Sequence, residues 1–155
     1  MKGYIQVYTG DEKGETLAVL GLSLRAAGAD FHVFFARFNT SIDASEINAL
    51  ERFSDLITVE QYGFGRFIDD RPLPEDVETV RKGITKAISI MSSGKHKLVV
   101  LDKIIAAARS GFIAEQDLLD VLSAKPDHVE LVITGQGASY RIIEQADLVT
   151  EIKLY

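Results

Sequence analysis

The sequence predicts a single α/β domain over residues 1–155, in which a mainly parallel sheet lies between two layers of helices. Short apolar runs of strand length alternate along the chain with longer stretches whose apolar residues recur at helical spacing. The segment 98–101 is apolar throughout, which is typical of a strand covered on both faces. With 46% hydrophobic residues and only three prolines, the chain has material for one large core and no obvious linker.

The first three elements are expected to be a strand, a helix and a second strand. Residues 4–8 have the length and composition of a short strand. Residues 16–27 place leucine and alanine at helical spacing, and Gly28 is a suitable helix end. Residues 31–38 are almost continuously apolar, which predicts a strand covered on both faces.

The middle of the chain continues the alternation. Residues 41–53 suggest a helix and residues 56–60 a third strand. The segment 63–74 is irregular enough to form a long loop. Pro74 suits the first turn of a long helix that ends near Ser-Ser-Gly at residues 92–94.

The remaining elements follow the same pattern. In order, they are a strand over 98–102, helices over 103–109 and 115–124, a strand over 129–134, a helix over 140–145 and a strand from Leu148. Strands separated by helices of this length favour parallel pairing.

Composition excludes several kinds of site. The chain has no cysteine, which rules out disulfides, thiolate zinc sites and cysteine nucleophiles. His32, His96 and His128 lie near expected element ends, where we expect them to be partly exposed. The net charge of −6 argues against an extensive nucleic-acid surface, and no apolar stretch approaches a membrane span. We therefore expect a cytoplasmic protein that binds neither nucleic acid nor membrane.

The loop over residues 9–16 has the layout of a phosphate-binding turn. A glycine-rich turn between a strand and a helix points backbone N–H groups at an anion, and the helix dipole adds partial positive charge. The usual pattern G-x-x-x-x-G-K-[ST] then supplies a lysine for the terminal phosphates and a hydroxyl for magnesium. Here the spacing is one residue short, and Glu15 precedes Thr16 where the lysine belongs. The acids indicate either an altered nucleotide site or simple stabilisation of a helix start.

Two further segments are expected beside this loop. In parallel sheets, ligands bind at the carboxyl ends of the strands. Asp102-Lys103 and residues 134–137 follow predicted strands, so they are candidates for one shared site with the loop.

Five segments together carry a resemblance to a known family. They are residues 3–10, 99–102, 118–126, 132–135 and 146–151. In their order and spacing, over nearly the whole chain, they resemble the ATP:corrinoid adenosyltransferases, which adenosylate cob(I)yrinic acid a,c-diamide and cob(I)alamin in cobalamin biosynthesis or salvage. The resemblance implies a homodimer with a P-loop NTPase-like fold that uses ATP, Mg²⁺ and a reduced corrinoid. In that family Co(I) attacks the 5′ carbon of ATP and triphosphate leaves, so the protein supplies positioning and electrostatics.

The resemblance also assigns roles in the loop. Gly10, Lys13, Gly14 and Thr16 match the family loop T-G-N-G-K-G-K-T, which is itself one residue shorter than the usual pattern. The acids are the departure: Asp11 and Glu12 replace Asn and Gly, and Glu15 replaces the second lysine.

At the other strand ends, the resemblance implies that Asp102, with Thr16, holds the magnesium ion. Lys103 stands where the family has Glu after that aspartate, and Gln136 stands where it has the Arg of T-G-R. Relative to the family, Lys has become Glu at position 15 and Glu has become Lys at position 103. We therefore predict an inverted ion pair between Glu15 and Lys103.

The substrate side departs as well. The family's aromatic pair in G-F-T-W is thought to exclude the lower axial ligand of cobalt, and here it reduces to Phe64 because Arg66 replaces the Trp. The basic residue expected after the second strand is absent at Thr40. Family members continue past T-E-M with a tail that helps cover the site, whereas this chain ends at Tyr155, so we expect that cover to be missing.

Two hypotheses follow from these changes. In the first, Lys13, backbone amides and Mg²⁺ hold the triphosphate and the chain is a working adenosyltransferase. In the second, it is a non-catalytic relative that binds a corrinoid, a nucleotide or a protein. An ordinary nucleoside-triphosphatase or kinase fits less well, because it needs a phosphate-binding lysine and an acid that activates water or a hydroxyl.

Overall fold

The computed structural model describes residues 1–11, 14–40, 44–64 and 71–155. Within these described ranges, six strands form one sheet in the order β3-β2-β4-β5-β1-β6, and every neighbouring pair is parallel. The strands are β1 (Ile5–Gly10), β2 (Val33–Phe38), β3 (Ile57–Tyr62), β4 (Leu98–Asp102), β5 (Glu130–Thr134) and β6 (Leu148–Ile152).

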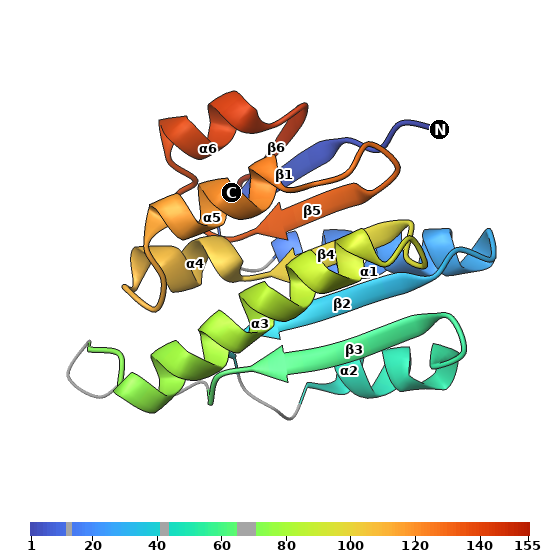
Figure 1. Cartoon of the computed structure of the whole chain (residues 1–155), viewed down its shortest axis with the longest axis horizontal. Coiled ribbons are helices and arrows are strands. Elements are labelled where there is room, and N and C mark those ends of the chain that lie inside the picture. The colour runs from blue at the N-terminus through green and yellow to red at the C-terminus, as the bar shows by residue number, and fades with distance from the viewer. Residues whose placement is uncertain (12–13, 41–43, 65–70) are drawn as a thin grey trace.

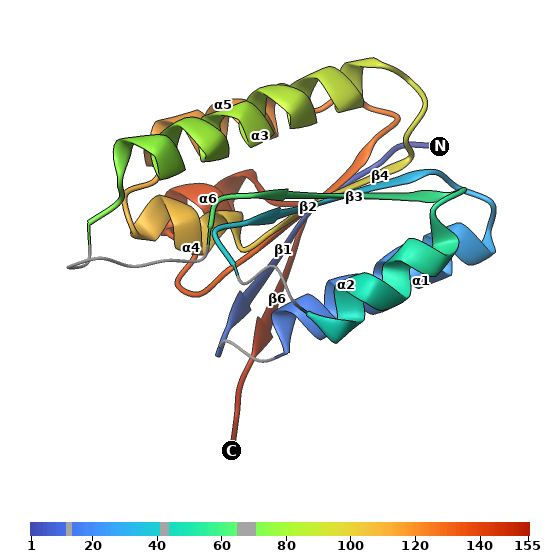
Figure 2. The same cartoon turned by 90° about the horizontal axis from the view of Figure 1, so that it is seen from below.

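Helices cover both faces of this sheet (Figure 1). They are α1 (Glu15–Gly28), α2 (Ser45–Leu50), the 3₁₀ turn η1 (Glu51–Phe53), α3 (Pro74–Ser92), α4 (Ile104–Arg109), α5 (Glu115–Ser123) and α6 (Tyr140–Gln145). Figure 2 shows α1 and α2 on one face and α3, α4, α5 and α6 on the other. The expected three-layer, P-loop NTPase-like fold class is therefore confirmed, with a sheet that is parallel throughout.

Most predicted elements agree with the structure to within two residues. β4 and α6 have the predicted bounds, and α3 begins at Pro74. The helix expected over 41–53 is different: its described part is α2 followed by the turn η1, and residues 41–43 lie outside the described chain. Six residues of the long loop expected over 63–74, residues 65–70, also lie outside it.

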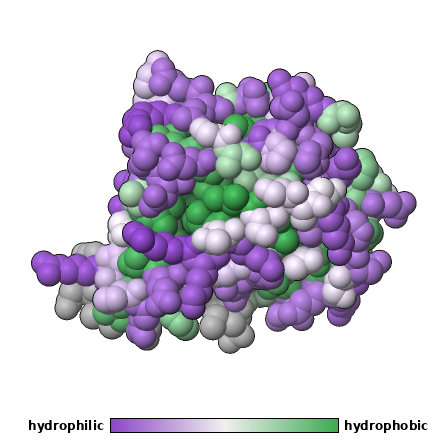
Figure 3. Space-filling model, viewed as in Figure 1, coloured by the Kyte–Doolittle hydropathy of each residue, from purple (hydrophilic) through white to green (hydrophobic). Residues whose placement is uncertain are grey.

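The core has one part on each side of the sheet, because side chains alternate between the two faces of a strand. In β2, Phe34 packs in the cluster under α3, α4, α5 and α6, whereas Phe35 packs in the cluster under α1 and α2. On the face with α3 and α5, apolar surface gathers near the middle (Figure 3). Among the described residues, no helix has both the length and the apolar character needed to cross a bilayer.

One histidine prediction is wrong. His96 was expected to be partly exposed, yet its side chain is buried, with its ring edge-on to that of Phe34 at 6.1 Å between centroids. Burial lowers the pKa of His96 below its ordinary value, and the charges of Lys95, His32 and Lys86 lower it further. The short turn before β4 places this ring in the core, which the pattern of neighbouring lysines did not indicate.

Candidate functional site

Three polar side chains lie together at the carboxyl ends of the central strands. Asp102 is the last residue of β4, Arg37 is its register partner on β2, and Thr134 is the last residue of β5. Each follows by two positions a residue of the cluster under α1 and α2, namely Phe35, Val100 and Val132. Because residues two apart share a face, all three polar side chains lie on the face covered by α1 and α2.

The Asp102 carboxylate is fully buried and contacts three side chains. Its Oδ1 accepts hydrogen bonds from the Thr134 hydroxyl at 2.8 Å and the Thr16 hydroxyl at 3.1 Å. Its Oδ2 lies 3.3 Å from the same Thr16 hydroxyl and 3.2 Å from Nε of Arg37. Thr16 and Asp102, the predicted magnesium ligands, are thus brought into direct contact.

Burial raises the pKa of Asp102 above its ordinary value, because the charged form is poorly solvated. The hydrogen bond from Thr134, the charge of Arg37, the hydrogen bond from Thr16 and the charge of Lys103 all oppose that rise. Burial therefore disfavours the charged form of Asp102, and its polar neighbours favour it.

Arg37 is a site residue that the sequence did not reveal. Only 5% of it is exposed, and its Nη1 lies 3.7 Å from the Glu46 carboxylate of α2. The available signal was one charged residue inside an otherwise apolar strand. The family resemblance placed a basic residue at position 40, but the structure has its cation three residues earlier, beneath α2.

The glycine-rich loop packs against the end of β6 and is hydrogen-bonded to it. Gly10 has a φ of +124°, and a Cβ there would lie 2.0 Å from the Ile152 carbonyl oxygen. The Asp11 N–H donates to that same oxygen at 2.8 Å, and the Asp11 carboxylate accepts from the Leu154 N–H at 2.9 Å. The Asp11 N–H, one of the loop groups expected to bind phosphate, is therefore already bonded to β6. Glu12 and Lys13 lie outside the described residues.

Glu15, the acid at the lysine position, is the first residue of α1 and only 1% exposed. The helix begins after Gly14, which makes no side-chain cap. Glu15 is therefore not a solvated surface acid, as the simplest explanation of the acidic loop required.

The predicted ion pair between Glu15 and Lys103 is wrong: no such pair is present among the ion pairs of the described chain. Lys103 has a left-handed backbone, with a φ of 64°, immediately before α4. This turn directs its N–H to the Thr134 hydroxyl at 2.8 Å, and its charge acts on Asp102.

The other predicted residues also follow the carboxyl ends of strands. Gln136 follows β5, and its backbone oxygen accepts from Arg109 of α4 at 3.4 Å. Phe64 follows β3 and is 49% exposed. Arg66, its predicted partner on the corrinoid side, lies outside the described residues.

These contacts do not fit a magnesium ion at Asp102. A magnesium ion bound directly to Asp102 would need an open carboxylate oxygen in near-octahedral geometry, and magnesium usually keeps several waters. Asp102 has no exposed surface, and both of its oxygens face donors of the protein itself. A guanidinium and a divalent cation also repel each other, so Arg37 and magnesium would compete for this carboxylate.

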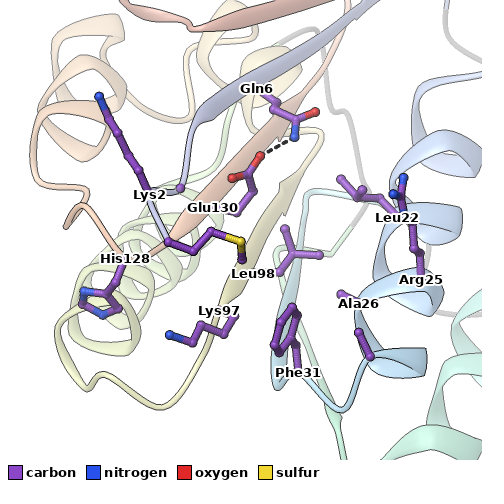
Figure 4. A pocket seen from close by; sticks show the side chains of 13 residues that line it. Lys2, Gln6, Leu22, Arg25, Ala26, Phe31, Lys97, Leu98, His128 and Glu130 are labelled. Atoms are coloured by element: carbon purple, nitrogen blue, oxygen red, sulfur yellow. Dashed lines mark hydrogen bonds between the residues drawn. The ribbon is translucent and has the colours of Figure 1, made fainter.

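A separate pocket of about 400 Å³ lies at the opposite ends of the strands. Figure 4 shows Lys97 and Leu98 at the start of β4, Glu130 at the start of β5, and Leu22 of α1 around it. It shares no residue with the group around Asp102 and is therefore not part of this site.

Comparisons with known proteins agree with the resemblance. The family model for "ATP:corrinoid adenosyltransferase BtuR/CobO/CobP" matches residues 1–155. A corrinoid adenosyltransferase of Pseudomonas aeruginosa is 27% identical over 154 residues, covering 99% of this chain and 76% of that protein. One from Sinorhizobium sp. is 30% identical over 156 residues, covering 99% and 73%.

A longer relative is also similar. The uncharacterized protein all2391 of Nostoc sp. is 31% identical over 171 residues, and the match covers 99% of this chain but 44% of that protein. The chain thus spans less than half the length of this relative. With a family model that matches from the first residue to the last, the chain belongs to the ATP:corrinoid adenosyltransferase family.

Proposed function

We propose that this chain binds a corrinoid without transferring the adenosyl group of MgATP to it. The observation that supports this proposal is the burial of Glu15, only 1% exposed, at the position where the family loop has its phosphate-binding lysine. The chain would then be a non-catalytic relative that keeps the substrate side of the fold.

The charge at position 15 acts on a bound phosphate through its sign and through how little water screens it. A unit charge about 4 Å from a phosphate contributes roughly 4 kcal/mol at an effective dielectric near 20. Replacing a cation by a carboxylate turns that attraction into a repulsion of similar size. Because Glu15 is buried, water and salt screen it less than they would a surface acid. The Asp11 N–H, already bonded to Ile152, is not available to offset the repulsion.

The aromatic residue on the expected corrinoid side supports corrinoid binding. Phe64 stands at the carboxyl end of β3, is 49% exposed, and matches the aromatic of the family's G-F-T-W segment. A large exposed aromatic at a sheet edge offers the flat apolar contact that a corrin macrocycle can use.

The second candidate function is the family's reaction itself. The contact between Thr16 and Asp102 favours it, because those are the two residues that the resemblance assigns to the metal. In this case Mg²⁺ would displace Arg37 from Asp102 but keep Thr16 beside it, and Lys13 would hold the triphosphate.

Calorimetry with MgATP separates the two functions. We expect no binding by the native chain, and measurable binding by Glu15→Lys, which restores the loop cation. Glu144→Lys, which changes an exposed acid on α6 by the same charge, is the matched control and should not bind. Micromolar binding of MgATP by the native chain would support the second candidate.

Corrinoid binding is measured by the change in the visible spectrum of a Co(II) corrinoid. We expect saturable binding that weakens in Phe64→Ala. The same spectra, recorded with a reduced corrinoid and MgATP, report adenosylation. Formation of an adenosylcorrinoid by the native chain would refute the proposal.

The family resemblance also suggests an oligomeric state and a cellular location. We propose that residues 1–155 act as one domain, and that the chain forms a homodimer in the cytoplasm. Sedimentation equilibrium of the purified chain tests the dimer directly, and a monomer at micromolar concentration would contradict it.

A further inference from the structure

The buried group around Asp102 has its own cation. Arg37 and Asp102 occupy opposed register positions on β2 and β4, and Nε of Arg37 lies 3.2 Å from Oδ2 of Asp102. Both residues are almost completely enclosed. The pairing of β2 with β4 fixes the two backbone positions, and burial leaves the side chains no room to rotate apart into solvent.

The remaining carboxylate contacts complete this arrangement. The hydroxyls of Thr16 and Thr134 donate to Asp102, and the Thr134 hydroxyl accepts the N–H of Lys103. The second carboxylate near the guanidinium, Glu46, lies on α2 and is partly exposed. The charge of Asp102 is thus balanced from within the fold.

We propose that Arg37 replaces the divalent cation at this site, so that Asp102 binds no metal and the chain binds its ligand without one. The guanidinium supplies a fixed positive charge at the carboxylate that the resemblance assigns to Mg²⁺. Arg37 and Asp102 lie at the same carboxyl ends of the strands as the proposed corrinoid site, but the exclusion of metal does not depend on corrinoid binding.

Manganese is the probe, because free Mn²⁺ has an electron paramagnetic resonance signal that binding removes and it accepts the same oxygen ligands as Mg²⁺. The full chain is titrated with Mn²⁺ alone and with Mn²⁺ and ATP. The second titration is compared with the same mixture lacking protein, because ATP itself binds Mn²⁺. Three variants are compared with the native protein: Arg37→Gln, Asp102→Asn, and the two changes together. Arg141→Gln is the control, because it removes a guanidinium from an exposed ion pair on α6.

We expect the native chain, Asp102→Asn and Arg141→Gln to take up Mn²⁺ equally weakly. Arg37→Gln leaves the Asp102 carboxylate without its cation, so its affinity for Mn²⁺ should rise by about tenfold or more, equivalent to about 1.4 kcal/mol. The double variant should lose that gain. Mn²⁺ should likewise raise the unfolding temperature of Arg37→Gln but not that of the native chain.

Binding of Mn²⁺ by the native chain that Asp102→Asn abolishes, with or without ATP, would overturn the proposal. Should a variant fail to fold, the native protein alone decides the question by nuclear magnetic resonance. The proposal requires that Mn²⁺ cause no selective broadening of the Thr16 and Thr134 amide signals, and selective broadening would refute it. These readouts involve no corrinoid, so their failure is distinct from a failure of the proposed function.

Discussion

Replacing Arg37 by glutamine should be one of the most destabilising single changes in this chain. The substitution keeps a polar side chain of moderate length but removes the positive charge opposite Asp102. That carboxylate is fully buried and cannot recover its solvation by turning toward water. Removing one partner of a buried ion pair therefore leaves an uncompensated charge in the protein interior.

The loss in the free energy of unfolding follows from the distance between the two charges. Opposite charges 3.2 Å apart attract by about 5 kcal/mol at an effective dielectric near 20. Loss of one partner of a buried pair costs about 3–5 kcal/mol in measured cases. The glutamine amide can still donate a hydrogen bond to Asp102, so we expect the free energy of unfolding to fall by about 3 kcal/mol.

Urea unfolding followed by circular dichroism measures this loss at pH 7.5. Arg141→Gln is the matched control: its pair with Glu115 spans 3.5 Å, but the two side chains are 58% and 35% exposed. It should cost less than about 1 kcal/mol. Combining Arg37→Gln with Asp102→Asn should recover at least about 1 kcal/mol of the loss, because no buried charge is then left unpaired.

The pH dependence supplies a second check on the same variant. Without Arg37, the pKa of Asp102 in the folded chain should rise further above its unfolded value. The stability deficit is then complete above the raised folded pKa of the variant. It shrinks as the pH falls from there toward the native folded pKa, because the carboxylate of the variant takes up its proton first. Arg37 does not stabilise the buried charge of Asp102 if Arg37→Gln costs no more stability than Arg141→Gln, or if its stability deficit does not shrink in acid.

Two further predictions concern the loop and the core. Gly10→Ala should lower the free energy of unfolding by more than about 2 kcal/mol, because the new Cβ meets the Ile152 oxygen and φ is +124°. Gly21→Ala, with open space around it on α1, should instead raise it by about 0.5–1 kcal/mol, and equal effects in urea unfolding would contradict the comparison. Because the folded pKa of His96 is lowered, native stability should fall as the pH drops below about 6.5, by at most about 1.4 kcal/mol per unit. His96→Phe, which suits the contact with Phe34, should flatten that slope between pH 7.5 and 5, and an unchanged slope would exclude His96 as its source.

Much of the fold was predictable because it depends on local burial patterns. An unbroken apolar run predicted β4, and a proline in a first turn predicted the start of α3. Each such signal depends only on which side chains a short segment must bury. The charge reversal at Glu15 was equally plain from the sequence, but its burial was not, since the pattern allowed a solvated acid at a helix start.

The sequence by itself determined the alternation of strands and helices, the family, and the positions of Thr16 and Asp102 at element ends. Only the tertiary structure decided which charges meet. Arg37 faces Asp102 because β2 and β4 are neighbours in a fixed register, although 65 residues separate them along the chain. The same holds at Lys103, whose left-handed backbone before α4 places its N–H against Thr134 and its charge near Asp102. Ion pairs between distant segments depend on strand order and backbone direction, which local sequence patterns do not encode.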